Sequence, residues 1–176
     1  YRDAAFQIAR ADQVPGQTIT WDMLLSFACS SEDPISGGRH KVLGSKALNI
    51  PPQTSTIASH LPKAVGAAYS IGLARRRPPE HRQYREDAIA ICSFGDASAN
   101  HSTAQGAFNA AQWTAYQSIP LPLMFVCEDN GIGISVKTPR GWIAAGFAHR
   151  PGLKYFSCDG LDIFDTYRAA QEAAHY

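Results

Sequence analysis

Asp96 and Asn130 each follow a continuous apolar stretch of the chain, at 88–94 and 121–127. Apolar runs of this length indicate strands that are buried in a parallel sheet. The segment between them, 103–117, has the apolar spacing of a helix, and a right-handed crossover of this kind places both strands in one sheet. Ligands bind beyond the carboxyl ends of such strands, so we expect the two polar side chains to meet at that edge.

These side chains offer one carboxylate and one amide oxygen, which suit a hard cation such as Mg²⁺. Phosphate oxygens commonly complete the shell of this ion, and the amides at Gly95, Ala97 and the start of the following helix could face a diphosphate. A carboxylate at such a turn would repel a phosphate unless a cation stood between them. The spacing also fits a plainer interpretation, with Asp96 as a helix N-cap and Asn130–Gly131 as an ordinary turn.

Other segments place the two strands in a larger arrangement. The low periodicity of 31–56 predicts a long loop, and the apolar pattern of 61–77 predicts a helix that Pro78 ends. The remaining predictions are two helical patterns within 1–30, a short extension at 132–136, a third strand at 154–158 and a helix from Ile163 onward. They predict the fold class α/β, with a doubly wound, mostly parallel sheet and helices on both faces.

Length and composition predict a single domain over 1–176, with N-terminal helices and a loop in 1–60 and the α/β core in 61–176. Both ends read as continuing helices, which predicts a piece of a longer protein. A hydrophobic content of 45% and a formal net charge of +1 argue against disorder and against nucleic-acid binding. No apolar stretch approaches the ~20 residues of a membrane span.

The histidines and cysteines lack the CxxC, HxxxH and HExxH spacings of zinc sites, so we expect no metal site built from local sequence. The cysteines are far apart in the chain and indicate reduced thiols in a cytosol-like compartment. They are Cys29, Cys92, Cys127 and Cys158.

The Gly95–Asp96 pair, followed after a helix and a strand by "CEDNGIGIS", resembles the thiamine-diphosphate motif of 2-oxo acid dehydrogenases. The resemblance is to the E1 α subunit of the branched-chain and pyruvate dehydrogenase complexes. Three further stretches are similar to that family in the same order, so that the likeness extends over nearly the whole chain. They are "YRD" at 1–3, the cofactor loop and helix "TSTIASHLPKAVGAAY" at 54–69, and "CDGLDIFDTYRAAQEA" at 158–173.

The resemblance implies a role for individual residues of this chain. It implies Mg²⁺ ligation by Asp96, by the Asn130 side chain and by the main-chain carbonyl of Ile132. It implies contacts to thiamine diphosphate from a larger set: Tyr1, Arg2, Ser55, Ile57 as the apolar wedge that bends the cofactor, Gly95, Asp96, Ala97, Asn130 and Ile132. Ser59 and His60 fall where the family offers polar atoms to a monovalent cation such as K⁺. His40 lies in the loop that borders the active site in this family, where an imidazole could transfer protons.

Two residues depart from the family's pattern at the core of the motif. Ala97 stands where the family usually has glycine after Gly-Asp, and its methyl group could crowd a diphosphate against the backbone. Asp129 stands where the first asparagine of an Asn-Asn pair is usual, but Asn130 is the residue that resembles the ligand.

The activity that the resemblance implies is oxidative decarboxylation of a 2-oxo acid, with transfer of the acyl group to the lipoyl group of an E2 acyltransferase. The carboxylate that activates the cofactor would come from an E1 β subunit or a fused β-like domain, in a heterotetramer or a homodimer of fused chains. The location would be the bacterial cytoplasm or the mitochondrial matrix.

Three alternatives remain open on the sequence. A transketolase-like or synthase-like enzyme would use the same cofactor for a different transfer. A cofactor-free assembly subunit would keep the fold while Ala97 blocks the cofactor. A nicotinamide site is the weakest alternative, because "GIG" at 131–133 lacks the third glycine and the strand-to-helix context.

Overall fold

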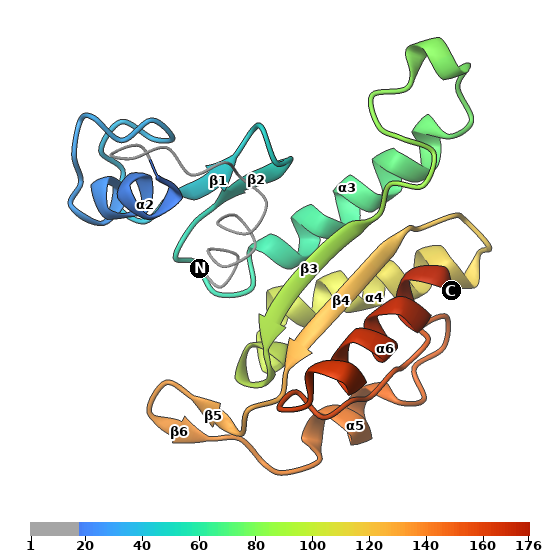
Figure 1. The fold of residues 1–176 in the computed structure, drawn as a ribbon. Coiled ribbons are helices and arrows are strands. Elements are labelled where there is room, and N and C mark those ends of the chain that lie inside the picture. Colours follow the sequence, from blue (N-terminus) through green and yellow to red (C-terminus); the bar gives the residue numbers. More distant parts are fainter. Residues whose placement is uncertain (1–17) are drawn as a thin grey trace. The chain divides into compact units, whose positions relative to one another are not determined.

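The structure is a computed structural model that describes residues 18–176. The chain divides into two compact units, Tyr1–Ser59 and His60–Tyr176, shown in Figure 1. The boundary lies one residue from the predicted division at 60, and the grouping of both parts into a single domain stays a prediction. The first helical pattern of 1–30 lies outside the described residues.

The first unit begins with helix α2 (Ile19–Phe27), which confirms the second helical pattern predicted within 1–30. The helix starts at Thr18, whose hydroxyl oxygen accepts a hydrogen bond from the amide of Trp21 at 3.2 Å, as a helix N-cap does. At its other end the buried Ser26 hydroxyl exchanges two hydrogen bonds with the backbone of Val42, donating at 3.3 Å and accepting at 3.2 Å. These bonds attach the helix to the segment that follows it.

A β-hairpin lies within 31–56, so the prediction of a loop over this whole stretch is wrong. Strands β1 (Leu43–Ser45) and β2 (Ile50–Gln53) pair antiparallel, and Asn49 before β2 has a φ of +55°. Asparagine tolerates this left-handed conformation better than most residues do. The strand escaped prediction because it contains Pro51 and Pro52, and proline is confined to edge strands and strand starts.

The second unit is built around strands β3 (Ala90–Gly95) and β4 (Leu123–Glu128), joined by helix α4 (Ser102–Tyr116). The strands pair in parallel, from Ala90 opposite Leu123 to Gly95 opposite Glu128. Figure 1 shows the two arrows side by side and pointing the same way. The predicted strand, crossover helix and strand are confirmed, with their ends shifted by one or two residues.

The core of this unit is aromatic. Phe108 of α4 is fully buried, and its ring centre lies 5.2 Å from that of Phe94, 5.1 Å from that of Phe125 and 4.9 Å from that of Phe147. These spacings are typical of tilted and edge-to-face ring pairs. Phe108 therefore holds α4 against one face of the β3–β4 pair.

The opposite face of the two strands is less well covered. Ile91 and Val126 point away from Phe94 because side chains alternate along a strand, and they are 60% and 40% exposed. Within the described residues the parallel sheet has two strands. The structure thus supports the α/β class, whereas the doubly wound sheet with helices on both faces stays a prediction.

Helix α3 (His60–Ala74) confirms the helix predicted over 61–77 but ends three residues earlier. It buries Leu61, Ala68 and Ile71, and packs against α4 and β3. Near the end of α3, Gly72 allows the backbone of Pro120 to approach so closely that a side chain at 72 would collide with it. The short 3₁₀ helix η1 (Pro79–His81) follows in the polar spacer.

After β4 the chain forms a second small hairpin and two more helices. Strands β5 (Ile132–Gly133) and β6 (Val136–Lys137) pair antiparallel where a short extension was predicted. Helix α5 (Trp142–Phe147) was not predicted. The strand predicted at 154–158 is wrong, because this segment joins no backbone ladder within the described residues.

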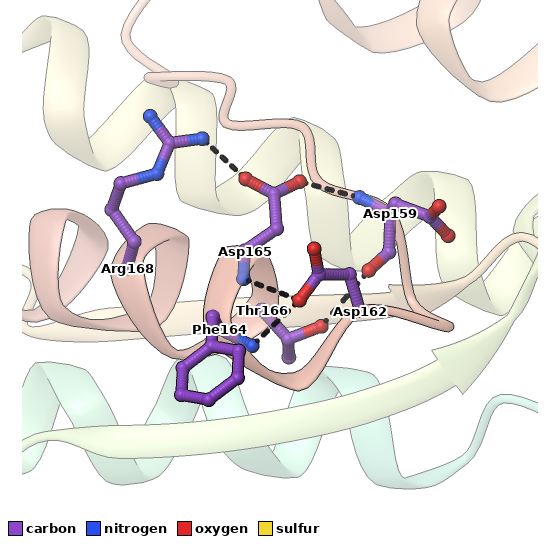
Figure 2. A network of polar contacts seen from close by, with 6 residues as sticks. All are labelled: Asp159, Asp162, Phe164, Asp165, Thr166 and Arg168. Atoms are coloured by element: carbon purple, nitrogen blue, oxygen red, sulfur yellow. Dashed lines mark hydrogen bonds and ion pairs between the residues drawn. The ribbon is translucent and has the colours of Figure 1, made fainter.

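Helix α6 (Ile163–His175) begins where the sequence predicts. Asp162 caps it by accepting hydrogen bonds from the amides of Phe164, at 2.9 Å, and Asp165, at 3.3 Å. Figure 2 shows that Asp165 in turn accepts from the amide of Asp159, at 2.8 Å, and pairs with Arg168. The Asp-Gly-Leu-Asp turn is therefore a capping structure. None of the helices within residues 18–176 combines the length and apolar content needed to cross a membrane.

Candidate functional site

Asp96 lies directly after β3, as the first residue of the 3₁₀ helix η2 (Asp96–Asn100), and it is 1% exposed. One carboxylate oxygen accepts from the amide of Ala97 at 2.8 Å. The other accepts from the amide of Gly131 at 3.0 Å and from the hydroxyl of Thr138. The carboxylate thus joins the end of β3 to the turn and hairpin after β4, so the two predicted segments do meet at one edge of the sheet.

Asn130 occupies the turn that contacts Asp96. Its side-chain oxygen accepts from the amide of Ile132 at 3.2 Å, and Gly131 between them has a φ of +76°. This is the local hydrogen bonding of an Asx turn. The side chain therefore has a structural role as a turn former here, and its role as a metal ligand stays a prediction.

The surroundings of Asp96 favour a cation. Among residues 18–176, its hydrogen-bond partners are neutral amides and a hydroxyl, and no lysine or arginine forms an ion pair with it. Buried carboxylates are usually paired with a positive charge or coordinate a metal. The acid, the Asn130 amide and the Ile132 carbonyl are all hard oxygen donors, so the donor set fits Mg²⁺.

Further negative charge surrounds this end of the sheet. Burial, with added repulsion from Asp129, Asp96 and Glu128, raises the pKa of the Cys127 thiol to about 12. The carboxylates contribute less to this shift than burial does, but their negative charge favours a cation nearby. In the described part of the chain, histidines, cysteines and carboxylates form no group of three that could hold a metal by themselves. A metal here would consequently depend on amide and carbonyl oxygens as well.

A short 3₁₀ helix, which the sequence did not predict, lies between Asp96 and the predicted helix at 103–117. The residues after Asp96 form η2, and α4 begins at Ser102. The N-terminus of α4 is capped by His101, whose Nδ1 accepts from the amide of Thr103 at 3.2 Å. The backbone amides nearest Asp96 are thus those of η2, and the amide of Ala97 is bonded to the carboxylate itself.

The other predicted cofactor residues lie in the first unit or outside the described residues. Tyr1 and Arg2 are outside the described range, while Ser55 and Ile57 are exposed. His40 is also exposed, and its Nδ1 lies 3.2 Å from the carbonyl oxygen of Phe27 and 3.5 Å from the sulfur of Cys29. Their roles in cofactor binding and proton transfer stay predictions.

The two residues of the predicted monovalent cation site differ in their bonding. The hydroxyl oxygen of Ser59 is buried and has no hydrogen-bond partner among residues 18–176, which leaves its lone pairs available to a ligand. His60 instead has Nε2 at 2.8 Å from the carbonyl oxygen of Ser93, a distance at which that nitrogen donates its proton. Because a donating nitrogen has no lone pair to offer, His60 could bind a cation only through another atom.

Two contacts of the site were not found from the sequence. Thr138 binds Asp96, and the indole nitrogen of Trp142 donates to the side-chain oxygen of Asn100 at 2.8 Å, which ties η2 to α5. In each contact the two residues are 42 positions apart in the chain, and neither Thr138 nor Trp142 lies in a recognisable motif.

The dehydrogenase E1 component family matches the chain over residues 1–176. The chain belongs to this family. It is 34% identical to the mitochondrial 2-oxoisovalerate dehydrogenase subunit alpha of Mus musculus over 145 residues, 80% of this chain and 29% of that protein. The mitochondrial subunit of the same name from Caenorhabditis elegans is 29% identical over 159 residues, 88% of this chain and 34% of that protein.

A bacterial protein with the same subunit name is also similar to this chain. The 2-oxoisovalerate dehydrogenase subunit alpha of Bacillus subtilis (strain 168) is 29% identical over 158 residues, 86% of this chain and 43% of that protein. The matched part of this E1 family member therefore spans between 29% and 43% of the length of these three relatives.

Proposed function

We propose that this chain is the part of an E1 α subunit that binds the Mg²⁺–diphosphate end of thiamine diphosphate, in an enzyme that oxidatively decarboxylates a 2-oxo acid. The observation that carries the proposal is Asp96: a buried carboxylate without a cationic partner among residues 18–176, at the carboxyl edge of a parallel strand pair. Ligands of open α/β folds bind at that edge. Membership in the dehydrogenase E1 component family supports the same function.

In this proposal the chain's own groups hold the cation and the diphosphate. Asp96, the Asn130 side chain and the Ile132 carbonyl supply oxygen ligands, and the turn at Gly95–Ala97 lies against the phosphates. Tyr1, Arg2, Ser55 and Ile57 contact the rest of the cofactor, and Ser59 with His60 forms the monovalent cation site. When bound, thiamine diphosphate would supply an electron sink for the electron pair that stays on the substrate when its carboxylate leaves as carbon dioxide.

The substrate class and the partners follow from the relatives. Because the relatives above are named as 2-oxoisovalerate dehydrogenase subunits, we infer a branched-chain 2-oxo acid as substrate. A β subunit or β-like domain would complete the active site, and a lipoyl acyltransferase would accept the acyl group. In the whole protein we expect the β3–β4 pair to extend into a doubly wound sheet.

The test is calorimetric titration of thiamine diphosphate into the full-length protein with its β partner, with and without Mg²⁺. We expect binding that requires Mg²⁺. Asp96→Asn keeps an oxygen that can accept from Gly131 and Thr138 but removes the charge. We expect it to weaken metal-dependent binding by at least about 100-fold, because loss of a ligand's charge should exceed the 10–100-fold cost typical of outer-shell partners.

Asp87→Asn is the matched control. Asp87 precedes β3, at the opposite end of the strand from Asp96, and pairs on the surface with Arg85 at 2.9 Å. Its loss should leave cofactor binding unchanged. If the wild-type protein shows no metal-dependent binding, the enzyme proposal fails and an assembly subunit remains. Turnover of branched 2-oxo acids with an artificial electron acceptor then separates a dehydrogenase from a transketolase-like enzyme.

A further inference from the structure

Gly133 of β5 and Ala97 of η2 lie against each other. A Cβ atom at position 133 would lie 2.5 Å from the Cβ of Ala97, whereas its next neighbour, a methyl carbon of Val136, would be 3.6 Å away. Carbon atoms attract at about 3.5–4.0 Å and repel strongly when they are much closer. In this geometry only one of the two positions can therefore carry a methyl group.

The contact joins the two backbone segments that carry the candidate metal ligands. Ala97 directly follows Asp96, and Gly133 directly follows Ile132. The same segments are held together by the hydrogen bonds that Asp96 accepts from Gly131, at 3.0 Å, and from Thr138. The hydrogen bonds draw the hairpin towards η2, and the methyl group limits how close it can come.

The geometry points to Ala97 and Gly133 as a matched positioning pair, in which the Ala97 methyl group fills the space that Gly133 leaves open and sets the separation between Asp96 and the Ile132 carbonyl. The inference rests on the function proposed above. It also gives a structural reason for alanine where the family usually has glycine, because the methyl group is accommodated by the hairpin.

The test is a pair of substitutions and their combination in the full-length protein with its β partner. The two readouts are calorimetric Mg²⁺-dependent binding of thiamine diphosphate and denaturant unfolding without ligand. Gly133→Ala should weaken binding by about tenfold, as overpacking displaces the hairpin. Adding Ala97→Gly removes the clash, and we expect the double variant to recover affinity to within about threefold of wild type.

Gly72→Ala is the control for overpacking at a position far from the proposed metal ligands. A Cβ atom at 72 would collide with the backbone of Pro120, next to the start of β4 and away from Asp96. We expect this variant to lower the stability of the protein and to leave its metal-dependent affinity unchanged. Gly133 lies outside the positive-φ conformations that favour glycine, so the effect of alanine there is steric.

Unchanged binding by Gly133→Ala would overturn the inference, and so would a double variant as weak as Gly133→Ala alone. If Gly133→Ala does not fold, the double variant is compared with the Ala97→Gly single variant. The inference then requires that the double variant folds and binds thiamine diphosphate at least as tightly as Ala97→Gly does. Absence of metal-dependent binding in the wild-type protein would remove the proposed function, and this inference with it.

Discussion

Replacement of Thr138 by valine tests the contact that closes the site. Valine has nearly the same shape as threonine but cannot donate the hydrogen bond that the Asp96 carboxylate accepts. Among residues 18–176, Asp96 would keep the amides of Ala97 and Gly131 as its donors. Hydrogen bonds to charged groups contribute about 1.5–3 kcal/mol, so we expect the unliganded protein to lose about 2 kcal/mol of unfolding free energy.

A double-mutant cycle isolates this contact. In an Asp96→Ala background the hydroxyl has lost its partner, so Thr138→Val should cost less than about 0.5 kcal/mol. Thr138→Ser, which keeps the hydroxyl group, should preserve most of the stability. The difference between the two backgrounds, at least about 1.5 kcal/mol, is the coupling free energy between Asp96 and Thr138.

The assay is urea unfolding, in which the free energy extrapolated to water is compared at equal slope. Two structural probes must report the same transition for each variant, because the chain contains two compact units. An equal cost of Thr138→Val with and without Asp96 would refute the reasoning. It would mean that valine disturbs the packing of the hairpin rather than the bonding of the carboxylate.

Two further predictions concern the core. Phe108→Ala removes the ring that contacts three other aromatic rings and should cost about 3–5 kcal/mol in unfolding experiments, whereas Trp113→Ala on the same helix, 71% exposed, should cost no more than about 0.5 kcal/mol. Burial raises the pKa of the Cys92 thiol from 9.0 to about 12. The free energy of unfolding should therefore fall as the pH rises between these values, because the unfolded chain loses the thiol proton first. In Cys92→Ala, the free energy of unfolding should depend less on pH over this range.

The parts of the fold that the sequence predicts are those with a strong local pattern. The runs at 88–94 and 121–127 are continuously apolar, and they became β3 and β4 with α4 between them. The β1–β2 hairpin has no such pattern, since prolines interrupt its second strand. The segment 154–158 has strand-like residues, but a strand also requires a neighbour to complete its hydrogen bonds, which the local sequence does not reveal.

The candidate site was predictable where it follows from the crossover. Parallel pairing brings the residues after β3 next to the residues after β4, so Asp96 and the Asn130 turn had to be close. The role of Thr138 depends on how a two-stranded hairpin folds back, and the opposition of Ala97 and Gly133 depends on how closely two backbone segments approach each other. Neither leaves a periodic signal in the sequence.

The parallel β3–β4 pair also constrains the order in which this unit folds. Residue 90 pairs with residue 123, so each hydrogen bond of the ladder closes a long loop and has to overcome its entropy. The 15 residues of α4 can form local helical structure first, which shortens the chain between the strands. We therefore expect the helix and its Phe108 contacts to lead and the ladder to follow. A late ladder would expose the edges of both strands to intermolecular pairing during folding.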